Sequence, residues 1–221
     1  MKKTLICMTL SSLLSAAFIT PALAVEGLSA NVAATSNYLW RGLEQTNGAA
    51  AISGGIDYEA SSGFYLGTLV SNADWAEDMT YELDLYGGYS TEINDNFSYD
   101  VGFIYYAYPD EKTGKADFSE VYGSISYDAL TLGVAVLTSG EDADAGDTIY
   151  ATADYTIALE NEAEIALHLG SYTGDWLSED IIDYGVSINK SGFTLGASAT
   201  DLDGAAGDVK FYIAYSVDID L

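Results

Sequence analysis

The chain has very few cysteine and basic residues, and each shortage excludes a class of protein. Its one cysteine, Cys7, lies in an apolar segment upstream of where a lipoprotein attachment cysteine would lie, so neither disulfides nor lipidation is expected. Seven Lys and Arg stand against 34 Asp and Glu, for a formal net charge of −27. Nucleic acid is therefore excluded as a partner, because attraction to phosphates needs a basic surface.

Long hydrophobic runs are also missing. No segment after the first residues offers the roughly 18 continuous apolar residues of a transmembrane helix. At the start, Lys2 and Lys3, a mostly apolar stretch over 5–19 and a small-residue site at 22–24 form the pattern of a secretory signal peptide. We therefore expect residues 1–24 to be a signal peptide and residues 25–221 to form one barrel domain without a plug domain.

From residue 29 onward the chain alternates polar with apolar or aromatic residues. In the last segment every second residue from 209 to 221 is apolar or aromatic, and a period of two is typical of β-strands. Disorder is not indicated despite the acidity, because 49% of the residues are hydrophobic. A soluble β-sandwich would also alternate, but these segments are near the length that crosses a bilayer, and no Cys or Trp core pattern is present.

The pattern predicts an all-β fold, an antiparallel transmembrane β-barrel of about 12 strands. Short connections alternate with longer acidic ones, which is typical of periplasmic turns and extracellular loops. We expect strands near residues 28–39, 49–60, 64–72, 80–91, 97–108, 118–127, 130–138, 148–158, 163–172, 181–189, 193–200 and 209–220.

The acidic residues indicate which side of each strand faces inward. Glu82 and Asp84 alternate with Leu83 and Leu85, and placing two carboxylates in hydrocarbon would cost a few kcal/mol each. The acids therefore point into the lumen, where fixed negative charge would favour cations. Alternatively, they only solvate a polar interior. The residues predicted to line the lumen with charge are Asp57, Glu59, Glu82, Asp84, Asp100, Glu120, Asp154, Glu164, Asp183 and Arg41.

Arg41 is the only arginine, and it lies in the first long connection directly after Trp40. Two interpretations are open. Arg41 could line a constriction, or it could pair with nearby acids such as Asp57 or Glu59, or brace the loop before Gly42. The second interpretation is favoured, since an arginine among so many acids readily finds a partner.

Acidic loops raise the question of a metal site. Glu141, Asp142, Asp144 and Asp147 could supply oxygen ligands to Ca²⁺ or Mg²⁺. Their spacing does not fit an EF-hand loop, so a solvated acidic loop is favoured, and no metal or cofactor is expected. Divalent ions that bridge these loops to anionic lipid headgroups stay an alternative.

Two other functions compete with a channel. A lipid hydrolase would need a His beside a Ser on the lipid-facing wall, whereas the single His168 shares the inward phase of the acids, so no enzyme is expected. A plugged structural or adhesive barrel would act through its loops, with its interior filled by bulky side chains. The tyrosines in the inward phase are Tyr86, Tyr106, Tyr108, Tyr122, Tyr150, Tyr172 and Tyr212.

The first third of the chain after residue 24 resembles a known family. Trp40-Arg41-Gly42 followed by Gln45-Thr46, together with the segments 54–58 and 82–89, resembles the TorF-like family of outer-membrane porins. The family usually has Ser where this chain has Glu44. The resemblance implies a barrel with a pore and carries over no catalytic or substrate-binding residue.

Together these features predict a porin-like passive channel in the cell outer membrane. Its partners would be outer-membrane lipid and small hydrophilic solutes, with a preference for cations. The pattern predicts neither the identity of the solute nor the oligomeric state.

Overall fold

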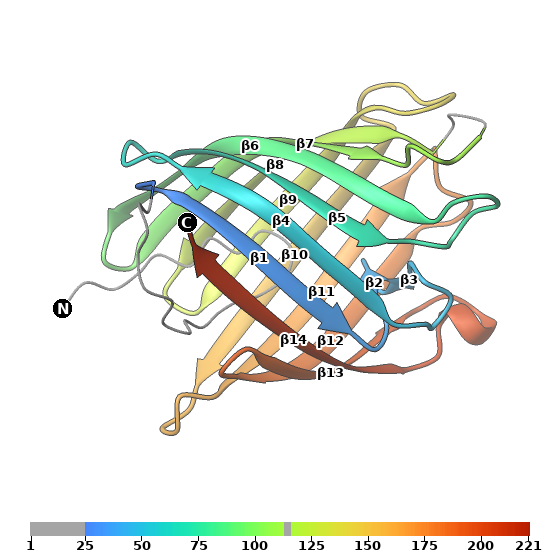
Figure 1. Ribbon diagram of the computed structural model, residues 1–221. Helices are drawn as coiled ribbons and strands as arrows, with labels where there is room; N and C mark the ends of the chain where they lie inside the picture. Colours follow the sequence, from blue (N-terminus) through green and yellow to red (C-terminus); the bar gives the residue numbers. More distant parts are fainter. Residues whose placement is uncertain (1–24, 113–115) are drawn as a thin grey trace.

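The computed structural model describes residues 25–112 and 116–221, and these form a closed antiparallel β-barrel (Figure 1). Twelve strands make the wall, and each pairs with the strands next to it along the chain. The barrel closes where β1 (Leu28–Thr35) pairs with β14 (Lys210–Asp220). The predicted signal peptide, residues 1–24, lies outside the described residues. Within the described residues, no helix is long and apolar enough to cross a membrane.

The positions of the strands confirm the predicted all-β barrel and its strand count. Between β1 and β14 the wall contains β4 (Ala51–Glu59), β5 (Phe64–Asn72), β6 (Tyr81–Asn94), β7 (Phe97–Ala107), β8 (Phe118–Tyr127), β9 (Leu130–Ser139), β10 (Thr148–Ala158), β11 (Glu164–Gly174), β12 (Ile181–Lys190) and β13 (Phe193–Thr200). Most limits agree with the alternation to within two residues. The first strand is shorter than predicted, because the chain leaves the wall after Thr35.

The two ends of the barrel differ in their connections. At one end, called here the short-turn end, tight turns join the strands, such as 128–129 and 191–192. At the other, the long-loop end, the connections are longer, and the last one contains the short helix η1 (Gly204–Ala206). Figure 1 shows the short-turn end on the left and the long-loop end on the right.

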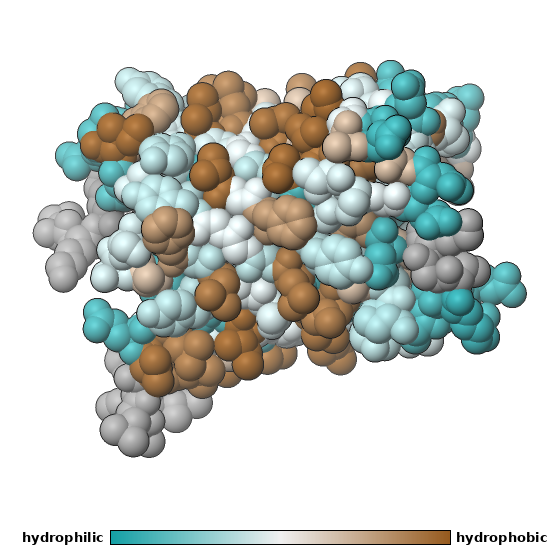
Figure 2. Space-filling view, turned by 90° about the horizontal axis from the view of Figure 1, so that it is seen from above, coloured by the Kyte–Doolittle hydropathy of each residue, from teal (hydrophilic) through white to brown (hydrophobic). Residues whose placement is uncertain are grey.

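Every second side chain of each strand points away from the lumen, and the outer wall is apolar because the residues at these positions are mostly apolar. Ile52 and Phe211 are 69% and 74% exposed, as expected for side chains that face lipid. Figure 2 shows apolar side chains across the middle of the wall and hydrophilic ones gathered at the long-loop end. Aromatic residues also lie on this outer surface at strand ends, including Tyr127 and Phe193.

Buried apolar side chains lie inside the barrel, toward the long-loop end. Tyr106, Phe118 and Leu137 belong to this cluster, and Trp40 and Trp176 pack against it. Since a 12-stranded barrel is wider than one that its wall side chains alone can fill, this packing needs additional groups inside the lumen. Those groups come from the first long connection.

Candidate functional site: a hairpin inside the barrel

The connection between β1 and β4 contains a small hairpin. Its strands β2 (Leu39–Trp40) and β3 (Leu43–Glu44) pair across a two-residue turn. Arg41 and Gly42 in that turn have φ angles of 50° and 75°, and positive φ at both central residues is typical of a type I′ turn. Glycine adopts this conformation readily, but an arginine rarely does, so other contacts must hold Arg41 there.

The hairpin lies inside the ring of strands, toward the long-loop end (Figure 1). The ring of Trp40 lies 5.9 Å from the rings of Tyr106 and Phe118 and 5.8 Å from the ring of Tyr172, which places it against β7, β8 and β11. Gly42 is so close to the inner face of β12 and β13 that an added Cβ would lie 2.6 Å from Thr200 Cγ2. The hairpin therefore contacts strands on several sides of the wall.

Arg41 is held by a carboxylate and three aromatic rings, a group that we call the Arg41 cage. Its Nη2 donates to Glu120 Oε2 at 2.6 Å, and the two side chains are only 6% and 1% exposed. Its guanidinium carbon lies 4.1, 4.2 and 4.5 Å from the ring centres of Trp40, Tyr150 and Tyr172. Burial lowers the pKa of Arg41, but the charge and hydrogen bond of Glu120, together with Tyr106 and Tyr172, raise this pKa to a net value above the ordinary one.

The predicted partners of Arg41 were wrong. Asp57 accepts hydrogen bonds from Asn31 Nδ2 at 2.9 Å and from the Tyr86 hydroxyl, and Glu59 is exposed at the short-turn end. The reason is distance along the wall. Asp57 is six residues into β4, which places it roughly 20 Å from the long-loop end at about 3.4 Å per residue. Glu120 is only two residues into β8, at the level of the hairpin.

A second set of contacts anchors the start of the first long connection. Glu82 accepts hydrogen bonds from the hydroxyls of Tyr38 at 2.6 Å and Tyr108 at 2.7 Å, and it is 2% exposed. Burial, followed by the Glu82 carboxylate, raises the pKa of both Tyr38 and Tyr108, so both phenols stay protonated donors. Asp84, two residues along the same inner face, is also 2% exposed.

His168 links two acids on the inner face of the barrel. Its Nδ1 lies 2.6 Å from Asp154 Oδ1, and its Nε2 lies 2.8 Å from Asp183 Oδ1. The Tyr150 hydroxyl donates to Asp183 at 3.1 Å. His168 therefore faces the lumen, on the side opposite to the lipid surface where a lipid hydrolase would need it.

The remaining predicted acids lie nearer the short-turn end. Asp100 accepts from the Tyr65 hydroxyl at 2.7 Å, and that hydroxyl lies 2.6 Å from the hydroxyl of Tyr122. Glu164 begins β11 and is partly exposed. The predicted lumen charges that are at most 5% exposed are Glu82, Asp84, Asp100, Glu120 and Asp183.

The acidic loop around residue 142 has the structure of a solvated turn. The Asp147 carboxylate accepts from the backbone N–H of Asp144 at 2.7 Å, and the Trp176 indole donates to the backbone oxygen of Glu141. Over 25–112 and 116–221, no group of three or more His, Cys, Asp and Glu side chains has an arrangement that could hold a metal ion.

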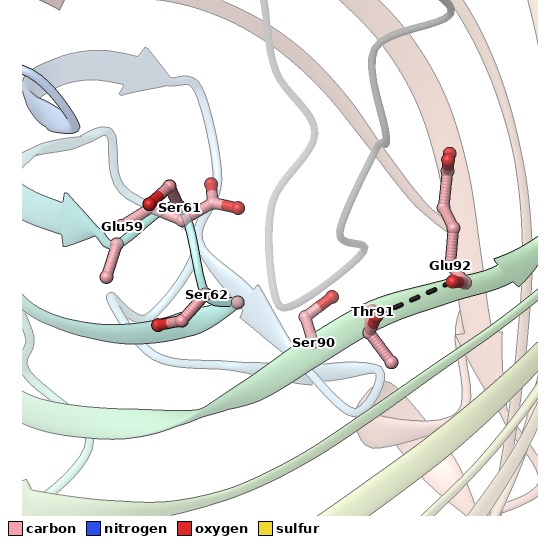
Figure 3. A pocket seen from close by; sticks show the side chains of 8 residues that line it. Glu59, Ser61, Ser62, Ser90, Thr91 and Glu92 are labelled. Carbon is pink, nitrogen blue, oxygen red and sulfur yellow. Dashed lines mark hydrogen bonds between the residues drawn. The ribbon is translucent and has the colours of Figure 1, made fainter.

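A shallow depression at the short-turn end also contains acids. It is lined by residues 59–63 and 90–92. In Figure 3 the side chain of Glu92 lies apart from Glu59 and from Ser61 and Ser62. These groups do not converge on a common point, so the depression does not form a site.

The sequence interpretation missed that the first long connection enters the lumen. Its composition indicated this, because Trp40 and Leu43 are apolar and lie where an acidic surface loop was expected. A single arginine surrounded by carboxylates was a second signal. Neither identifies Glu120 as the partner, since that pairing depends on the three-dimensional position of β8.

The fold is similar to solved porin barrels. The KdgM porin matches with a TM-score of 0.54 and 13% identity over 87% of this chain and 99% of that chain. The KdgM porin in complex with disordered oligogalacturonate matches with a TM-score of 0.51 and 14% identity over 88% and 98%. A structure from work on in-meso crystallization of membrane proteins matches with a TM-score of 0.57 and 11% identity over 88% and 84%. At these identities the likeness shows a shared fold.

The sequence comparisons place the chain in a family. None of the curated proteins compared with it matches. A family model described as "Bacterial protein of unknown function (Gcw_chp)" matches residues 21–218, nearly the whole chain. This match does not confirm the TorF-like resemblance, which stays a prediction. The chain belongs to the Gcw_chp family.

Proposed function

We propose that this protein is a porin-like channel of the outer membrane that passes small hydrophilic solutes passively, through a lumen narrowed by the β2–β3 hairpin. The observation that carries the proposal is the closed 12-stranded barrel with an apolar outer wall and a polar, acid-rich inner wall. Only a closed barrel satisfies all backbone hydrogen bonds of strands that cross lipid. A polar interior in such a barrel is typical of a water-filled path.

A preference for cations follows from the balance of charge on the inner wall. Asp57, Asp154 and Glu164 are partly exposed on this face, whereas Arg41 is neutralised by Glu120. Lys210 also lies on the inner face, near the long-loop end, and donates to backbone oxygens of the last loop. Excess negative charge in a narrow passage concentrates cations and repels anions.

The solved porins and the sequence markers support the same class of function. A neighbour of this fold holds oligogalacturonate, which is consistent with the passage of small solutes through such a barrel. The predicted signal peptide and the TorF-like resemblance support an outer-membrane location. The acidic inner wall of this chain gives no reason to expect an acidic sugar as its own solute.

Planar-bilayer recording of the refolded protein tests the proposal. We expect small unitary currents with reversal potentials that favour K⁺ over Cl⁻ in a salt gradient. Absence of unitary currents in both the unaltered protein and a variant without the hairpin would contradict the channel. Reversal potentials that favour Cl⁻ would contradict cation preference while leaving the channel in place.

A second candidate is a plugged structural barrel that acts through its loops. The observation in its favour is the packing around the hairpin, where Leu137, Thr148 and Glu120 are 0%, 0% and 1% exposed. A barrel that conducts only after the hairpin has been removed would support this second function over the first.

A further inference from the structure

Most of the Arg41 cage belongs to the barrel wall. Glu120 comes from β8, Tyr150 from β10 and Tyr172 from β11, so these groups do not depend on the hairpin for their positions. The register between β8 and β9 shifts between Ser119 and Glu120, and such a bulge re-aims the neighbouring side chain. A carboxylate beside aromatic faces is the arrangement that binds organic cations.

Arg41 and Glu120 form only one of the two hydrogen bonds that a guanidinium and a carboxylate can form with each other. Arg41 reaches Glu120 through one nitrogen and one oxygen, at 2.6 Å. Its other terminal nitrogen, Nη1, and the other oxygen, Glu120 Oε1, are buried without a hydrogen-bond partner. A guanidinium that is free to turn would normally pair with a carboxylate through two parallel hydrogen bonds. Arg41 is instead fixed in the turn of the hairpin, at a φ of 50°.

We propose that the wall of the Arg41 cage is a binding site for small guanidinium cations, and that Arg41 occupies it as a tethered ligand. Glu120 supplies the charge, and the faces of Tyr150 and Tyr172 supply cation–π contacts at the distances seen for Arg41. The proposal deepens the cation preference proposed above by naming a class of solute, and in that sense it rests on the proposed channel. The binding itself does not require conduction.

Arg41 is covalently part of the hairpin, so it competes with free cations for the site. A linked group competes at an effective concentration of about millimolar or more. Free guanidinium compounds should therefore bind weakly to the unaltered protein. They should bind more tightly once the Arg41 side chain has been removed and the cage is empty.

Chemical rescue of Arg41→Ala tests the site. We would add methylguanidinium to the refolded variant and follow its thermal unfolding temperature, which rises when a ligand binds the folded state. We expect half of the maximal rise at a methylguanidinium concentration at least tenfold lower than in the unaltered protein. Urea, which has a similar planar shape and no charge, should produce no rise. If Arg41→Ala does not refold, Arg41→Gln replaces it.

Two control variants make the test specific. Arg41→Ala combined with Glu120→Gln should lose the rescue, because the carboxylate is gone. Lys112→Ala, which removes an exposed ion pair with Asp78, should respond like the unaltered protein. An equal rise in the double variant would overturn the proposal, since binding would then not involve Glu120.

The readouts separate this proposal from the proposed channel. Rescue of thermal stability without any unitary current would retain the cation site and contradict the channel. Unitary currents without rescue would retain the channel and overturn the cation site.

Discussion

The two halves of the lumen share the same strands and the same alternation, yet their interiors differ. Toward the long-loop end, Glu120, Leu137 and Tyr172 are 1%, 0% and 3% exposed. Farther toward the short-turn end, the side chains of Asp154 and His168 are 31% and 32% exposed. The hairpin contacts the wall toward the long-loop end and accounts for the packing there, whereas nearer the short-turn end burial is local, as at Asp100, which is 5% exposed and accepts from the Tyr65 hydroxyl. A polar inner wall therefore forms either a packed core or a hydrated surface, depending on whether a loop fills the space.

Buried carboxylates in the packed half depend on protein partners more than the partly exposed carboxylates do. A charge removed from water must be paired or hydrogen-bonded, whereas a partly exposed one is also solvated. In the packed half, Glu120 has the Arg41 guanidinium and Glu82 has two phenol hydroxyls. The Asp154 carboxylate, which contacts His168, retains access to solvent. Equivalent substitutions in the two halves should therefore have unequal effects.

The largest effect should follow from removing the hairpin. Replacing residues 37–47 with a short Gly-Ser linker takes away the groups that fill the packed half, so unitary conductance in planar bilayers should rise several-fold. Shortening the last long loop, 201–209, is the matched control and should change conductance little. Equal conductance before and after removal of the hairpin would show that the hairpin does not limit the pore.

Removing one carboxylate from each half should lower the free energy of unfolding by unequal amounts. Glu120→Gln leaves Arg41 buried and unpaired, and we expect a loss of about 3 kcal/mol in the free energy of unfolding. Asp154→Asn breaks a contact that is partly solvated, and we expect a loss of about 1 kcal/mol or less. Urea titration of both variants in lipid vesicles measures the difference. Similar losses for the two variants would mean that the packed half is as hydrated as the other.

A smaller change tests how closely the hairpin fits against the wall. Gly42→Ala adds a methyl group that would lie 2.6 Å from Thr200 Cγ2 and 2.9 Å from Asp183 Cβ, at a φ of 75°. We expect a loss of roughly 1–3 kcal/mol from strain and overpacking. Gly146→Ala, also at positive φ but with no atom within 4 Å of the added Cβ, isolates the backbone contribution. An equal loss in both variants would indicate that Gly42 does not press against β12 and β13.

Sequence reasoning predicted the wall better than its contents. Period-two alternation reports which side chains face lipid, so the twelve strands and the inward position of residues such as Glu82 and His168 followed from local pattern. The pairing of Arg41 with Glu120 joins residues 79 positions apart, and no local pattern encodes it. The hairpin was missed for the same reason, because its burial depends on the width of a barrel that the other strands create.

The accessibility of single cysteines tests the central claim most directly, that the hairpin packs the long-loop half of the lumen more densely than the other half. Thr148 lies in the packed half and is 0% exposed, whereas Ser126 lies on the inner face toward the short-turn end and is partly exposed. With a charged thiol reagent, we expect Ser126→Cys to react at least ten times faster than Thr148→Cys, and replacement of the hairpin to bring the two rates together. Equal rates with the hairpin intact would contradict the account.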